Sequence, residues 1–272
     1  MALPSGGALH VSGPQRARPF LLLHGVGGGA WSWAPQAAAL ARTHRVFVWE
    51  ARGHGAARAV RDAGLGDYYR DAREALDVVA QGGPAWIGGH SMGGLLALAL
   101  AADRPGGVAG LALVDPVYAP EGAAHGGPLL ARSARTLLAP FVASMRRDGV
   151  VARAVARRVF AASFVDRACM ERAWRAQRTQ VPVEYPKMMY EAFEGPTNFD
   201  NRAFAREIAV PTLLLEPLAA PRPRFPQLVR ELFRLGERFG YLAVDGGHYL
   251  QLDRSAARVS DAIGEFAARW SR

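Results

Sequence analysis

Short apolar runs alternate with longer amphipathic segments along most of the 272-residue chain. Runs such as LALV and TLLL are apolar at consecutive positions, which is typical of parallel strands buried on both faces. The pattern predicts strands at 8–11, 19–23, 45–50, 84–88, 110–115, 211–216 and 241–245, and helices near 31–41, 67–81, 91–103, 225–238 and 253–270. Strands that alternate with helices indicate an α/β fold with a mostly parallel sheet flanked by helices.

The alternation is interrupted after residue 115, and no strand pattern returns until about residue 211. Within 148–160, valines and alanines recur at helical spacing while arginines occupy the other faces. We therefore predict a helical insertion at 116–205, set into a core domain made of residues 1–115 and 206–272.

Basic residues are concentrated in the predicted insertion. Lys187 is the only lysine, so arginine carries almost all of the positive charge behind the formal net charge of +9. Residues 130–180 contain eleven arginines against three acidic residues. Two interpretations are open: a solvated helical surface, or a surface that attracts an acidic carrier protein, coenzyme A or an anionic substrate. The segment matches no nucleic-acid recognition module, so we expect no nucleic-acid partner.

The single cysteine and the hydropathy exclude several classes of protein. Cys169 has no second cysteine for a disulfide, and the chain has no thiolate cluster for structural zinc. The longest apolar run, 95–102, is too short to cross a bilayer, and the N-terminal segment lacks the charged start and apolar centre of a targeting peptide. We therefore expect a cytoplasmic protein with no membrane partner.

Ser91 lies in the pentapeptide GHSMG, residues 89–93, which fits the pattern G-x-S-x-G. A predicted strand precedes the pentapeptide and an apolar predicted helix follows it. This context suits a strained strand-to-helix turn, which needs small neighbours and holds the serine hydroxyl clear of the main chain. Ser91 is therefore the predicted nucleophile.

A glycine-rich loop follows the second predicted strand, in LLLHGVGGGAW at residues 21–31. Such a loop can direct main-chain amides at a developing oxyanion. It has neither the lysine of a P-loop nor the glycine spacing of a dinucleotide-binding loop. We expect the amides of Val26 and Met92 to form an oxyanion hole.

His248 stands in a loop directly after the last predicted strand, in LAVDGGHYLQLD. It follows the serine in chain order and occupies a strand-end loop, which is the place of the general base in one class of serine hydrolase. His248 is therefore the predicted general base.

The motifs LLLHGVGGG, RGHG, GHSMGG, LALVDP, VPTLLL and GGHYLQLD together resemble those of the α/β-hydrolase superfamily, in the same order over residues 19–270. The resemblance implies a mostly parallel eight-stranded sheet, with Ser91 and His248 catalytic, and the insertion resembles a cap domain. Dehalogenases and epoxide hydrolases of this fold carry an aspartate in place of Ser91. The resemblance therefore favours an esterase-like or thioesterase-like enzyme.

The acid of the expected triad is not evident, although an acid fixes the imidazole tautomer and stabilises the imidazolium. In most of the family it follows the strand that reads PTLLLE here, and the loop PLAAPRPRF contains no aspartate. Asp115 ends the strand GLALVD, where it resembles the alternative acid of haloalkane dehalogenase relatives, and is the first choice. Glu216 is the alternative acid, and Asp245 is better explained by its Gly-Gly turn. A dyad without an acid stays open.

These residues predict a serine hydrolase that cleaves a carboxylic ester, lactone or thioester of a hydrophobic small molecule, without metal or cofactor. The lack of an acid in the usual family position, after PTLLLE, supports a second hypothesis. The chain would then be a non-hydrolytic tailoring enzyme of the same fold (a lyase, a cyclase or an enzyme that cleaves C–C bonds) or a ligand-binding relative. Apolar residues of the insertion can line an acyl pocket, although we expect most to form its core: Phe141, Phe160, Phe164, Trp174, Met188, Met189, Tyr190 and Phe193.

Overall fold

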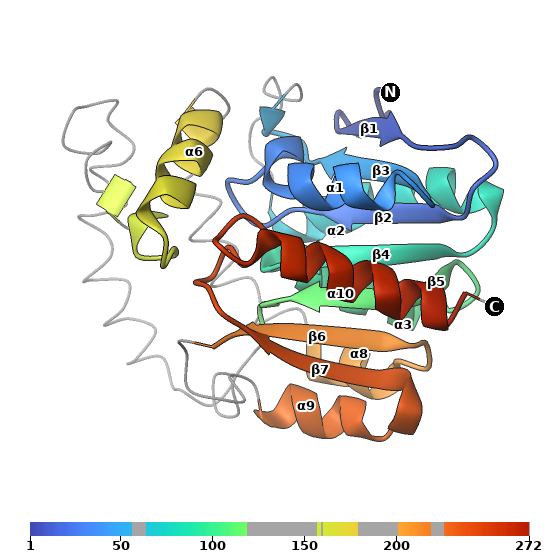
Figure 1. The fold of residues 1–272 in the computed structure, drawn as a ribbon. Helices are drawn as coiled ribbons and strands as arrows, with labels where there is room; N and C mark the ends of the chain where they lie inside the picture. Colours follow the sequence, from blue (N-terminus) through green and yellow to red (C-terminus); the bar gives the residue numbers. More distant parts are fainter. Residues whose placement is uncertain (56–63, 119–156, 159, 179–200, 219–225, 272) are drawn as a thin grey trace, which may run out of the picture.

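The computed structural model describes residues 1–55, 64–118, 157–158, 160–178, 201–218 and 226–271. Within these ranges the chain forms an α/β fold, with one sheet and helices on both of its faces (Figure 1). The strands lie side by side in the order β1-β3-β2-β4-β5-β6-β7. They are β1 (Ala8–Ser12), β2 (Pro19–Leu23), β3 (Arg45–Glu50), β4 (Ala85–His90), β5 (Val108–Val114), β6 (Thr212–Pro217) and β7 (Phe239–Val244). β1 runs antiparallel to β3, and the other neighbouring pairs are parallel.

All seven strands predicted from the sequence are present, but the sheet of the described residues lacks the eighth strand that the family resemblance implies. Ahead of β1 the chain makes a tight turn instead. The amide of Leu3 donates to the carbonyl of Gly7, and the amide of Gly6 donates back to the carbonyl of Leu3, each at 2.9 Å. An isolated bridge joins Ala2 to Ala8, and Met1 and Leu9 exchange two hydrogen bonds between their main-chain groups at 2.8 Å each. The turn folds the segment back onto the start of β1, so it does not extend into another strand.

Alternate side chains of the central strands pack on opposite faces of the sheet, because successive residues of a strand point in opposite directions. In β2, Phe20 and Leu22 join one apolar cluster, whereas Leu21 and Leu23 join the other. Two helices cover the first face, and the remaining core helices cover the second. The first pair is α1 (Ala34–Leu40) and α10 (Ala256–Arg269), and the second group is α2 (Leu65–Val79), α3 (Met92–Asp103), α8 (Asn201–Glu207) and α9 (Pro226–Phe233).

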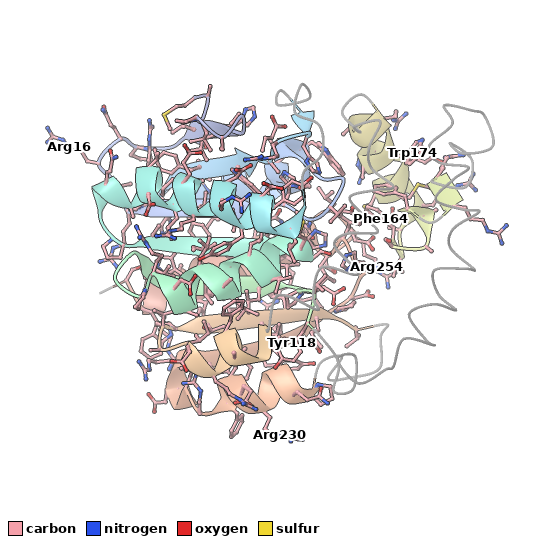
Figure 2. All side chains as sticks on the ribbon, turned by 180° about the vertical axis from the view of Figure 1, so that it is seen from behind. Arg16, Tyr118, Phe164, Trp174, Arg230 and Arg254 are labelled. Carbon is pink, nitrogen blue, oxygen red and sulfur yellow. The ribbon has the colours of Figure 1, made fainter. Side chains whose placement is uncertain are left out.

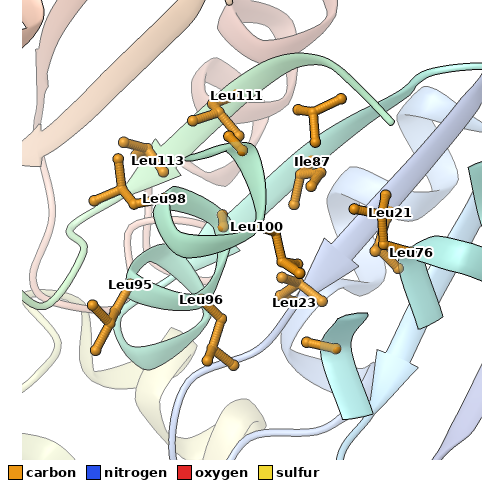
Figure 3. Packing of buried hydrophobic residues seen from close by; sticks show 14 of the residues in the cluster. Leu21, Leu23, Leu76, Ile87, Leu95, Leu96, Leu98, Leu100, Leu111 and Leu113 are labelled. Atoms are coloured by element: carbon orange, nitrogen blue, oxygen red, sulfur yellow. The ribbon is translucent and has the colours of Figure 1, made fainter. Parts of the chain in front are cut away.

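Helix α3 is buried on all sides, which explains why its sequence is apolar at consecutive positions. Its leucines contact strand residues of β2, β4 and β5 on one side and α2 on another (Figure 3). Each buried leucine contributes about 1.5–3 kcal/mol relative to an exposed one. The helix therefore gives a rigid base to the turn that precedes it, where Ser91 lies.

Helix α6 (Arg167–Arg178) lies beyond the carboxyl end of β5, apart from the helices that cover the sheet (Figure 1). Most of the predicted insertion falls outside the described residues, including most of the helix predicted at 148–160. The division at 115/116 and 205/206 stays a prediction. No helix within the described ranges is long and apolar enough to cross a membrane.

Candidate active site

Ser91 occupies a sharp turn between the end of β4 and the start of α3. Its φ of 54° and ψ of −117° lie in a region that residues with a side chain rarely adopt. Main-chain hydrogen bonds hold this conformation: the amide of Ser91 donates to Val114 at 3.2 Å, and its carbonyl accepts from Gly94 and Val117 at 3.0 Å each. The strain is thus maintained by the ends of β5 and α3.

Small residues around the turn allow the main chains to approach one another. A Cβ on Gly93 would collide with the main chain of Leu23 at the end of β2. A Cβ on Gly25 would lie 2.9 Å from Cβ of Ser91, so the glycine-rich loop after β2 lies directly against the serine. The G-x-S-x-G spacing therefore has a steric cause in this fold.

His248 lies in the loop of residues 245–253, which we call the His248 loop, and its imidazole contacts Asp115. The Nδ1–H group donates to Oδ2 of Asp115 at 2.5 Å. The Asp115 carboxylate is fully buried at the end of β5, whereas the His248 side chain is 29% exposed. In the neutral imidazole this arrangement leaves Nε2 without a proton, and an unprotonated ring nitrogen is the atom that a general base uses.

The other two carboxylates considered from the sequence have different partners. Glu216 is buried on β6 and accepts a hydrogen bond from the hydroxyl of Tyr241 at 2.8 Å. Asp245 forms an exposed ion pair with Arg254. Of the three, Asp115 is the one that the structure brings to His248.

The amides of Val26 and Met92 belong to the two segments that meet at Ser91. Met92 is the first residue of α3, and the first amides of a helix have no partner within the helix. Among the hydrogen bonds formed within the described ranges, neither amide is used as a donor. Neither amide therefore has an acceptor among the described residues.

Two buried histidines hold the glycine-rich loop. Nε2 of His54 accepts the amide of Gly27 at 3.1 Å. Nδ1–H of His24 donates to the carbonyl of Gly25 at 2.7 Å, and Nε2 of the same ring accepts the amide of Ala51 at 3.1 Å. Burial lowers the pKa of His24 and lowers the pKa of His54 well below its usual value. A ring nitrogen that accepts an amide carries no proton, and the lowered pKa of each histidine favours this neutral form.

A third buried histidine joins the serine turn to the His248 loop. Nε2–H of His90 donates to the main-chain carbonyl of His248 at 2.9 Å, and the centroids of the two imidazole rings lie 4.6 Å apart. Burial lowers the pKa of His90 well below its usual value, and the nearby His248 lowers it further. None of these three histidines was predicted to have a role. The available signal is their position at or just after the carboxyl ends of parallel strands.

An aromatic cluster adjoins the His248 loop. Tyr249 stacks on Phe164, with ring centroids 5.2 Å apart and planes 8° from parallel, and also contacts Phe160. Phe164 and Trp174 lie at the end of the sheet where α6 is found (Figure 2). These residues form a small apolar core between α6 and the loop. Phe141, Met188, Met189, Tyr190 and Phe193 lie outside the described residues.

A sequence comparison agrees with this geometry. A model of the family described as "Alpha/beta hydrolase family" matches residues 20–262. The chain belongs to the alpha/beta hydrolase family. This assignment agrees with the superfamily resemblance seen in the motifs. Within the described ranges no group of three His, Cys, Asp or Glu side chains is placed to hold a metal ion.

Curated relatives of this alpha/beta hydrolase match part of its length. A protein of Variovorax paradoxus named as the carbamate hydrolase RutD is 42% identical over 108 residues, which is 39% of this chain and 40% of that protein. The 3-oxoadipate enol-lactonase 1 of Acinetobacter baylyi is 32% identical over 91 residues, which is 34% of each chain. The chain thus spans less than half the length of the curated relatives it matches.

Solved structures match nearly the whole chain. An enol-lactonase of Burkholderia xenovorans has a TM-score of 0.73 at 24% identity, with 96% of both chains covered. A thermophilic esterase of Thermogutta terrifontis has a TM-score of 0.75 at 22% identity, with 98% of this chain and 94% of that chain covered. At these identities the likeness shows the fold.

Proposed function

We propose that this alpha/beta hydrolase is a serine hydrolase that cleaves a carboxylic ester, lactone or thioester of a hydrophobic small molecule. The observation that carries the proposal is the 2.5 Å hydrogen bond from Nδ1–H of His248 to Asp115. It holds the tautomer whose Nε2 accepts a proton, in a loop bonded to the residue next to the strained Ser91.

The chemistry proceeds in two acyl-transfer steps. Nε2 of His248 takes the proton of the Ser91 hydroxyl as Oγ attacks the substrate carbonyl carbon, and Asp115 stabilises the resulting imidazolium. The amides of Val26 and Met92 donate to the oxyanion of the tetrahedral intermediate. The C–O or C–S bond then breaks, and the imidazolium gives its proton to the leaving group. Water repeats the sequence on the acyl-enzyme and releases the acid.

The position of Asp115 favours hydrolysis over the alternative of a non-hydrolytic enzyme or a ligand-binding relative. That alternative depended on the lack of an acid after β6, and Asp115 supplies an acid from the end of β5. Relatives named as a carbamate hydrolase and an enol-lactonase also favour attack on an activated carbonyl.

The cap and a charged partner belong to the same proposal. We assign residues 116–205 to a cap domain, and we place the aromatic cluster at Tyr249 beside the apolar part of the substrate. Exposed arginines near α6, such as Arg158, Arg167 and Arg175, favour a substrate carried by an acidic carrier protein or by coenzyme A.

Labelling with a fluorophosphonate tests the nucleophile, because this probe reacts with activated serine hydroxyls. We expect the wild-type protein to be labelled and Ser91→Ala to lose all labelling. Ser12→Ala, which removes an exposed hydroxyl from β1, is the matched control and should be labelled like the wild type. Equal labelling of Ser91→Ala and the wild type would refute the assignment. A panel of esters, lactones and thioesters then identifies the substrate class.

A further inference from the structure

We propose that Asp253 is a positioning residue that holds the main chain of His248 and joins it to the segment before α6. This inference rests on the proposed role of His248 as general base. Asp253 stands five residues after His248 at the end of the His248 loop and is almost completely buried. Its carboxylate binds main-chain amides, so Asp253 acts on His248 through the main chain of the loop.

The carboxylate accepts hydrogen bonds from four main-chain amides. Oδ2 accepts from Gly247 and from Val165, each at 2.8 Å. Oδ1 accepts from Asp166 at 3.0 Å and from Arg254 at 2.9 Å. Hydrogen bonds to an ionised acceptor are roughly twice as strong as those between neutral groups. Both oxygens are therefore committed to main-chain donors from two segments far apart in sequence.

The two segments also pack directly on one another. The amide of Tyr249 donates to the carbonyl of Ser163 at 3.3 Å. A Cβ on Gly247 would collide with the same carbonyl, so the His248 loop needs a glycine where residues 163–166 cross it. The stacking of Phe164 on Tyr249 extends this contact. The segment before α6 thus lies against the main chain on both sides of His248.

His248 is consequently held from two directions. Asp253 holds the amide of Gly247, one residue before it, and His90 holds the carbonyl of His248 itself. The imidazole keeps its 2.5 Å contact with Asp115 only while this stretch of main chain stays in place. A misplacement of about 1 Å at a reacting group costs up to about 100-fold in rate. Asp253 therefore couples the alignment of the base to the position of residues 163–166.

Asp253→Asn tests this role with almost no change in shape. An asparagine has one carbonyl oxygen, so whichever way the amide is turned, two of the four main-chain donors face an NH2 group. Asp245→Asn is the matched control, because it removes the same charge from an exposed carboxylate of the same loop. Thermal melting shows that each variant is folded at the temperature of the measurements.

Two readouts are compared between the variants. The first is the rate of fluorophosphonate labelling of Ser91, which we expect to fall by about 10-fold to 100-fold in Asp253→Asn and to stay unchanged in Asp245→Asn. The second is the pair of ring-nitrogen NMR shifts of His248, assigned by their loss in His248→Ala. These shifts report the tautomer, and in Asp253→Asn we expect them to move toward a mixture of tautomers. A loss of stability alone leaves the tautomer of the folded protein unchanged.

The two readouts separate this inference from the proposed function. If the wild type is not labelled at all, the proposed function fails, and the NMR shifts still decide whether Asp253 positions His248. Asp253→Glu, which moves the carboxylate by one methylene, is measured as a second variant where Asp253→Asn does not fold. Wild-type NMR shifts in a folded variant at position 253 overturn the inference.

Discussion

Replacing Asp115 with asparagine removes the negative charge from the contact with Nδ1–H of His248. The carboxylate is fully buried, and its Oδ2 lies 2.5 Å from Nδ1 of His248. This distance leaves no room for a water molecule that could bridge the two groups. If the asparagine NH2 group faces His248, the proton moves to Nε2 and the ring can no longer accept the proton of Ser91. If the carbonyl oxygen faces His248, the tautomer survives but the imidazolium loses its counter-charge.

Both orientations lower the rate of ester cleavage. A change of this kind in a serine triad costs about 10⁴-fold in kcat. At 1.36 kcal/mol for each factor of ten, this is about 5.4 kcal/mol of transition-state stabilisation. Hydrolysis of p-nitrophenyl acetate by the folded Asp115→Asn variant measures the change, with thermal melting to show that the fold persists.

Glu216→Gln is the control for this measurement. A glutamine at position 216 keeps an oxygen that accepts the hydroxyl of Tyr241, so we expect a rate close to that of the wild type. Two results would refute the reasoning: a rate for Asp115→Asn within tenfold of the wild type, or a larger loss in Glu216→Gln than in Asp115→Asn. The second result would assign the acid to Glu216.

Two further predictions concern solution conditions. The folded state lowers the pKa of His24, His54 and His90, so below pH 6.5 the unfolded chain binds more protons than the folded one, and the free energy of unfolding falls as the pH decreases. The contribution of these neutral histidines to the free energy of unfolding is complete above pH 6.5. Urea unfolding measures it, and a midpoint that stays constant between about pH 7 and pH 5 would contradict the prediction. If an acidic carrier delivers the substrate, raising the salt concentration from about 0.05 to 0.5 M should lower kcat/KM for a carrier-bound thioester by about tenfold and leave a free neutral ester nearly unchanged. Equal salt effects on both substrates would argue against a charged carrier.

The layered architecture could be predicted because it depends on local patterns. Phe20 and Leu22 pack on one face of β2 while Leu21 and Leu23 pack on the other, and only burial on both faces explains so continuous an apolar run. The turn at Ser91 could also be predicted, because its strand, its glycines and its helix are adjacent in the chain. The expected eighth strand came from the family pattern; the described residues form seven strands, and a turn precedes β1.

The sequence favoured Asp115 as the partner of His248 but left Glu216 and a dyad without an acid open. In β6 the alternation of side chains turns Glu216 away from the face that Leu215 occupies, and the hydroxyl of Tyr241 takes up its carboxylate. No local pattern indicates that β7 places Tyr241 there. The roles of His90 and Asp253 were missed for the same reason, because each acts on main-chain groups of a distant segment.

The fold class, the strand positions and the segments that hold Ser91, the glycine-rich loop and His248 could all be read from the sequence. Each of these features depends on a local pattern, in which the residues involved lie close together in the sequence. Which acid contacts His248, and what holds the His248 loop, depends on contacts between distant segments. Asp115 and His248 are separated by 133 residues, and they meet because β5, β6 and β7 lie in register with their carboxyl ends at one edge of the sheet. Such a contact depends on strand order and on side-chain direction together. No single stretch of the sequence indicates both of them.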